Sequence, residues 1–177
     1  MRVSTTNIAS HRPGKLYFYA DRDSVERAFQ SGEFRLRPAT PGLPSGAPQV
    51  SQILPFGPSK SLASVGFLTL SLSTILHTPL YQNCVVIHNT EEFGERLHRA
   101  VQQALPQWAG IDAAVTYGSA SPLGSVFTKT IQLSPQQEWL FAWRPMQPSL
   151  ALNPIQVQIG SLAEIADLLE PQHVAPQ

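Results

Sequence analysis

Proline is the residue that most limits what this chain can fold into. The 177 residues include 16 prolines, spread over most of the chain. A proline inside a helix removes a backbone hydrogen bond and clashes with the preceding turn, so a bundle of long helices is excluded. Six prolines and three glycines fall between residues 38 and 60. We expect residues 1–177 to form a single domain. Residues 38–60 should form a long loop of that domain, which serves as a lid, serves as a partner-binding arm or is simply mobile.

Between the prolines and glycines, short segments show the periodicities of strands and helices. Strands are predicted at 16–20, 34–37, 66–74, 84–87, 113–117, 126–133, 138–143 and 155–159. Helices are predicted where apolar residues recur every three or four positions behind capping residues: Asp23 with Glu26, Thr90, and Ser161 with Glu164. Because strands dominate and adjacent strands lack regular intervening helices, the predicted fold is α+β. It has a mainly antiparallel sheet with two or three helices packed on it, and a frayed tail from residue 171.

Charge and composition narrow the classes of partner. Twelve basic and twelve acidic residues give a formal net charge of zero, so no long-range field draws the chain to nucleic acid or to an anionic membrane. A neutral surface favours association, which predicts a protein partner or a homo-oligomer. The polar stretch 1–13 does not resemble a signal peptide, and the stretch 65–76 is too short and polar to span a bilayer. With a single cysteine, Cys84, we expect a cytoplasmic protein.

Common catalytic and metal-binding motifs are missing from the sequence. It has no glycine-rich phosphate loop, no paired cysteines and no pair of histidines at metal-ligand spacing, so no metal is expected. His77 and His88 flank predicted strands and remain candidate site residues. His98 lies on a charged helix face and is interpreted as solvated.

The segment 127–143 is the most informative part of the sequence. Glu138 enters a strand whose other members are strongly apolar, and a carboxylate in that position must be paired, solvated or functional. Lys129 on the preceding predicted strand is a natural cross-strand partner. The structural interpretation is therefore a Lys129–Glu138 pair that pins a hairpin.

Two resemblances add a functional interpretation. The opening at 16–19 and 31–36 is similar to that of a broad class of uncharacterised bacterial and phage proteins. Those proteins carry a late motif F-x-K, then a spacer, then Q-x-E-[YW]-R. The matching residues here are Phe127, Lys129, Gln136, Glu138 and Trp139, whereas Leu140 stands in place of the arginine.

The layout also resembles the ADP-ribosyltransferase fold, whose members carry an early strand with Arg or His, a central S-T-S-like strand and a late Q/E-x-E motif. Residues 70–74 and 136–138 match the last two. The resemblance implies that NAD is bound and that Glu138 stabilises the positive charge that develops on the nicotinamide ribose. It also implies that Gln136 orients the attacking group and that Ser71 or Ser73 supports the nicotinamide pocket. The early strand departs from the pattern: Tyr17 and Tyr19 occupy it in place of a basic residue, and Arg22, the nearest arginine, lies just outside it.

Two classes of function remain open. The first is an ADP-ribosyltransferase-like toxin, effector or phage accessory protein, which requires Glu138, Gln136 and one of Ser71 or Ser73 to converge on a cleft large enough for NAD. A Glu138 side chain that points onto Lys129 in a filled core would count against this class. The second is a non-enzymatic assembly or interaction protein, for example a component of a phage virion. In the second class, Lys129 and Glu138 serve only to hold the sheet together.

Overall fold

The computed structural model describes residues 11–39, 66–77, 83–147 and 153–170. Most of the 38–60 excursion and the tail from 171 lie outside the described residues, so those expectations stay predictions. In chain order the elements are β1 Leu16–Ala20, α1 Arg22–Ser31, β2 Glu33–Pro38, β3 Leu68–Ser73, β4 Asn83–Ile87, α2 Thr90–Ala104, β5 Trp108–Ala114, β6 Thr116–Tyr117, the 3-10 helix η1 Ser125–Phe127, β7 Thr128–Lys129, the 3-10 helix η2 Ile131–Gln136, β8 Glu138–Pro145, β9 Ile155–Gln158 and β10 Ala166–Leu169.

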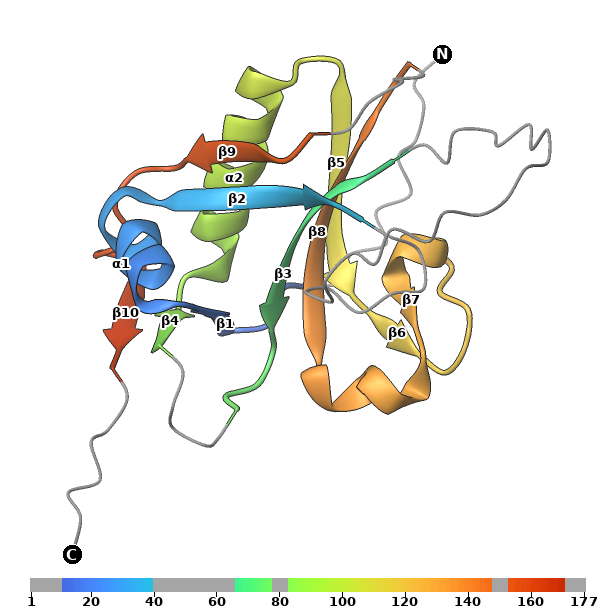
Figure 1. The fold of residues 1–177 in the computed structure, drawn as a ribbon, viewed down its shortest axis with the longest axis horizontal. Helices are drawn as coiled ribbons and strands as arrows, with labels where there is room; N and C mark the ends of the chain where they lie inside the picture. The colour runs from blue at the N-terminus through green and yellow to red at the C-terminus, as the bar shows by residue number, and fades with distance from the viewer. Residues whose placement is uncertain (1–10, 40–65, 78–82, 148–152, 171–177) are drawn as a thin grey trace, which may run out of the picture.

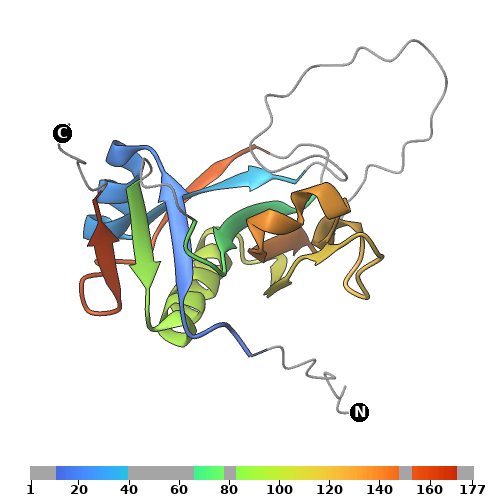
Figure 2. The ribbon, with the colours of Figure 1, turned by 90° about the horizontal axis from the view of Figure 1, so that it is seen from below.

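Strand β3 is the hub of the main sheet. Along one edge it pairs with β8, which in turn pairs with β5. Along its other edge it pairs first with β2 and then, through Ser73 alone, with β1. The strands β1 and β2 therefore leave β3 in different directions, with α1 between them (Figure 1). Strands β4 and β10 extend the β1 arm, whose three strands lie side by side in Figure 2, and β9 extends the β2 arm.

The predicted fold class is confirmed at the level of α+β with a mainly antiparallel sheet. Among the described residues, all pairings of the main sheet are antiparallel, and only the small β6–β7 ribbon is parallel. Helix α2 packs its apolar residues Phe93, Leu97 and Val101 against one face of the sheet. None of the helices in the described segments is long and apolar enough to cross a membrane.

Both α-helices are capped by a residue that precedes the predicted one, by two positions in α1 and by one in α2. Helix α1 is capped by Asp21, whose carboxylate accepts a hydrogen bond from the Ser24 amide at 2.9 Å, so the predicted capping by Asp23 is wrong. Asn89 caps α2 rather than Thr90. The Thr90 hydroxyl instead donates to the carbonyl of Pro13 at 2.7 Å and holds the N-terminal segment.

Strand β8 is buried on both faces, which explains its nearly continuous apolar sequence. Trp139, Phe141 and Trp143 face the main core under α2. Leu140 and Ala142 point to the opposite face and pack in a smaller cluster with Phe127 and Val115. Glu138 begins the strand on this second face, since residues two apart in a strand share a face.

The predicted strand at 126–133 is wrong over most of its length. Only 128–129 pair as a strand, flanked by η1 and η2. The Thr128 hydroxyl donates to the carbonyl of Gly124 at 3.0 Å and accepts from the Ser121 amide at 2.9 Å. These side-chain bonds to the backbone favour a compact turn over an extended ladder. The predicted strand at 113–117 is divided between two strands, because 113–114 end β5, which begins at Trp108, and 116–117 form β6.

The predicted helix from Ser161 is also wrong. Residues 163–165 form a turn, and 166–169 form β10, which pairs with β4. The carbonyl of Ile165 accepts from the amides of His88 and Asn89 at 2.9 and 3.2 Å. A helix this short has little stability by itself. Pairing with the otherwise open edge of β4 therefore decides the conformation.

Candidate functional site

Glu138 is the centre of a buried polar cluster. Its side chain is 7% exposed, and Lys129 Nζ lies 2.7 Å from its Oε1 and 2.6 Å from its Oε2. The Ser71 hydroxyl donates to Oε1 at 2.7 Å, and the Tyr117 hydroxyl donates to Oε2 at 3.2 Å. The four contacts occupy the four acceptor positions of a carboxylate. Glu138 is therefore fully hydrogen-bonded and held in one orientation.

The predicted Lys129–Glu138 contact is confirmed, but the predicted hairpin is not. Lys129 lies on β7, which pairs with β6, whereas β8 pairs with β3 and β5. The lysine therefore reaches Glu138 from a separate ribbon rather than across a ladder. The pair ties this ribbon to the main sheet.

Tyr117 completes the cluster and was not singled out by the sequence. Its hydroxyl also accepts a hydrogen bond from the Glu138 amide at 2.9 Å. Burial, with a further contribution from the negative charge of Glu138, raises the pKa of Tyr117 to about 12. The side chain therefore stays a neutral hydrogen-bond donor at physiological pH. Tyr117 is the second residue of the two-residue strand β6, and only the fold brings it to Glu138.

Three of the residues predicted to form the site lie in one row across the sheet. Tyr17 pairs with Ser73, and Ser73 pairs with Glu138, so the row crosses β1, β3 and β8. Directly paired residues project to the same face of a sheet. Ser71 lies two positions before Ser73 and shares that face, where it contacts Glu138. The structure thus brings together Tyr17, Ser71, Ser73 and Glu138.

The remaining predicted residues are placed differently. Gln136 ends η2 next to the row, and its carbonyl, rather than its side chain, accepts from the Ser73 hydroxyl at 3.1 Å. Arg22 lies at the start of α1, largely exposed, and pairs with Glu26 at 2.8 Å. It is not among the residues that contact Glu138.

His77 lies beside this row, as its position after a strand had suggested. Its Nε2 is 2.9 Å from the Ser73 hydroxyl, and its backbone amide donates to the Tyr19 hydroxyl at 2.7 Å. The other candidate, His88, is on the surface, 3.9 Å from Asp167. His77 and Tyr19 thus add an imidazole and a phenol at the end of β3.

The backbone just before Glu138 is tightly fixed. Gln137 adopts a left-handed φ of 44°, which is uncommon for a residue with a side chain. Its carbonyl accepts from both the amide and the hydroxyl of Thr74, at 2.8 and 3.0 Å. These bonds join the end of β3 to the start of β8. They hold Ser73 and Glu138 in register.

A second polar cluster lies on the opposite, α2-facing side of the sheet. Asp112 on β5 accepts from Arg12 at 2.7 and 2.8 Å, from His98 at 2.7 Å and from the indole of Trp139 at 2.9 Å. Burial by itself would raise the pKa of Asp112, but these donors outweigh it and hold the pKa well below its usual range.

His98 belongs to this second cluster, so its interpretation as a solvated residue is wrong. The indole of Trp143 can only donate, and it lies 3.0 Å from Nδ1 of His98. Nδ1 therefore accepts, and Nε2 carries the proton that bonds to Asp112. An aspartate in the apolar run 111–115 was the sequence signal for this cluster. The second cluster links the N-terminal segment, through Arg12, to α2 and to the sheet.

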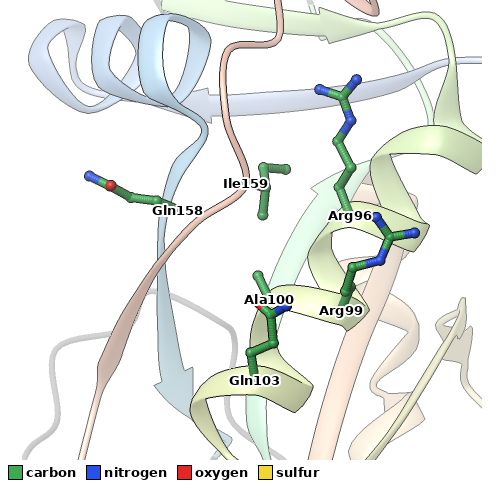
Figure 3. A pocket seen from close by; sticks show the side chains of 6 residues that line it. All are labelled: Arg96, Arg99, Ala100, Gln103, Gln158 and Ile159. Carbon is green, nitrogen blue, oxygen red and sulfur yellow. The ribbon is translucent and has the colours of Figure 1, made fainter.

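A shallow depression of about 150 Å³ lies between α2 and β9 (Figure 3). Arg96 and Arg99 extend from α2 beside it, whereas Gln158 extends away from the helix. Arg96 already binds Glu92 at 2.6 Å and the carbonyl of Ser161 at 3.1 Å. The depression is on the α2 side of the sheet and is separate from the Glu138 cluster. In the described part of the chain, no group of three His, Cys, Asp or Glu residues could hold a metal ion.

Comparison with models of known protein families finds no match, and comparisons with curated proteins and with solved structures find none either. The geometry of the site therefore carries the functional proposal.

Proposed function

We propose that this chain is an ADP-ribosyltransferase-like protein that takes NAD as substrate, with Glu138 as its central catalytic residue. One observation carries the proposal. The early strand, the S-T-S-like strand and the late Q-x-E strand, which are far apart in the sequence, are neighbours in the sheet as β1, β3 and β8. Their candidate residues Tyr17, Ser73 and Glu138 form a single cross-strand row.

The chemistry of such a site explains why a fixed carboxylate is useful. In ADP-ribosyl transfer the bond between nicotinamide nitrogen and ribose C1′ breaks, and nicotinamide leaves with the bonding electrons. The acceptor forms the new bond to C1′ and loses a proton. Positive charge develops on the ribose in the transition state, and a pre-positioned anion stabilises it. Lys129, Ser71 and Tyr117 fix the orientation of Glu138 before substrate arrives.

Substrate can bond to Glu138 only by replacing one of its present donors. The Tyr117 contact is the longest, at 3.2 Å, and joins a neutral donor to the carboxylate. Lys129 contacts both oxygens and carries a charge, so its displacement would leave a buried carboxylate uncompensated. A ribose hydroxyl would therefore take the place of the Tyr117 hydroxyl while Lys129 stays bound.

Labelled NAD tests this proposal. Purified protein is incubated with NAD and with a cell lysate, and both label transfer and nicotinamide release are measured. Glu138→Gln should lower both rates by about 100-fold or more, the range seen when one electrostatic group of a catalytic site is lost. Glu95→Gln makes the same chemical change at an exposed position of α2 and should leave the rates unchanged. Circular dichroism checks that both variants are folded.

The outcome distinguishes the enzyme from the non-enzymatic alternative. One observation favours that alternative: Glu138 points onto Lys129, both side chains are only 7% exposed, and all acceptor positions of the carboxylate are occupied. This is the arrangement expected of a structural pair rather than of a carboxylate in an open cleft. In an assembly or interaction protein the pair would only fasten the β6–β7 ribbon to the sheet. No activity in the wild type, or equal activity in the wild type and folded Glu138→Gln, would refute the transferase proposal.

A further inference from the structure

We propose that β5 pairs, antiparallel and about a two-fold axis at Ile111, with β5 of a second copy of this chain. Among the described residues, β5 pairs only with β8 and ends the strand order β10-β4-β1-β3-β8-β5. Its seven residues, Trp108–Ala114, leave one row of backbone donors and acceptors without a strand partner in that part of the chain. An edge of this kind is a template for pairing with another strand.

The usual protection of an edge strand is missing from β5. Soluble proteins block such edges with lysine, with proline or with an outward charge. The only charged residue of β5 is Asp112, and its carboxylate is turned towards α2, where Arg12, His98 and Trp139 neutralise and bind it. Ala109, Gly110, Ile111 and Ala114 are exposed, and Ile111 is 44% exposed. The exposed residues of the edge are therefore uncharged, and all of them except Ile111 are small.

The sequence of β5 is complementary to itself when two copies run antiparallel. With Ile111 opposite its own copy, Gly110 stands opposite Asp112, and Trp108 stands opposite Ala114. Each large side chain on that face thus meets a small one. On the other face Ala109 meets Ala113, with the two Ile111 side chains in contact at the centre. Because the strand is complementary to itself, the expected partner is a second copy of the chain in an isologous interface. The formal net charge is zero, so two copies do not repel each other electrostatically.

The mass of the protein in solution is the first test. Light scattering across a concentration series should show twice the mass of one chain at the upper end. Ile111→Lys places a charge at the centre of the edge and should return the protein to a monomer. Ile131→Lys changes an equally apolar residue, 57% exposed on η2, and should leave the dimer intact. A wild-type monomer at all concentrations would overturn the proposal, as would a dimer that survives Ile111→Lys.

A disulfide tests the two-fold axis directly. Residues directly opposite in an antiparallel pair have Cα atoms about 4.5–5.5 Å apart, within the range that a disulfide spans. Ile111→Cys should therefore form a covalent dimer under mild oxidation, whereas Ile131→Cys should not. Interference from Cys84 is small, because it is buried and burial raises the pKa of its thiol to about 11. Equal cross-linking of the two variants would refute pairing at Ile111 even if the protein is a dimer.

Discussion

Removing the charge of Lys129 should be among the most damaging single substitutions on the Glu138 side of the sheet. In Lys129→Met, the stem is replaced by a side chain of similar volume, but the carboxylate of Glu138 loses its counter-ion. Glu138 is only 7% exposed, so water cannot take the place of the ammonium group. The bonds from Ser71 and Tyr117 remain, at 2.7 and 3.2 Å. Removing one partner of a buried ion pair costs about 3–5 kcal/mol. We therefore expect Lys129→Met to lower the free energy of unfolding by about that amount.

A double-mutant cycle separates the interaction energy of Lys129 and Glu138 from the energy of packing their hydrocarbon parts. Free energies of unfolding are measured by urea denaturation for Lys129→Met, for Glu138→Gln and for the double variant. Because the double variant leaves no unpaired charge, its loss should be smaller than the sum of the single losses by at least about 1 kcal/mol. Lys15→Met, at an exposed lysine, serves as the control and should have little effect. Additive losses within about 0.5 kcal/mol would refute the reasoning, because independent sites give additivity.

Two further predictions concern the Asp112 cluster. A Cβ at Gly110 would overlap the indole of Trp143, so Gly110→Ala should destabilise the protein by about 1–3 kcal/mol in urea denaturation, whereas Gly14→Ala, with open space around it, should not. Because the folded pKa of Asp112 is depressed, its stabilising contribution is complete above the ordinary aspartate pKa of about 3.9 and is lost as pH falls further. Asp112→Asn should therefore lower the free energy of unfolding at neutral pH. Below about pH 4 the stability of the variant should fall less steeply than that of the wild type, in acid titrations followed by circular dichroism. An equally steep fall in both proteins would contradict a stabilising role of the Asp112 carboxylate.

Strands and helices with strong local signals were predictable from the sequence. β1, β3 and β8 follow from aromatic, alternating and continuous apolar runs, and α2 follows from its apolar stripe. The failures occurred where local and tertiary preferences compete. Residues 161–169 have helical spacing, yet the open edge of β4 makes the last four of them a strand. At 126–133 the hydroxyl of Thr128 bonds to the backbone and breaks up the expected strand.

The α+β class and the contact of Glu138 with Lys129, nine residues earlier in the chain, could be predicted from the sequence. These follow from periodicity and from the cost of an unpaired buried charge, which both act over short distances along the chain. By contrast, the row of Tyr17, Ser73 and Glu138 and the contact of Arg12 with Asp112, 100 residues away, became visible only in the folded chain. Such contacts depend on which strands pair and in which register, and the register is set by packing the whole core rather than by local sequence.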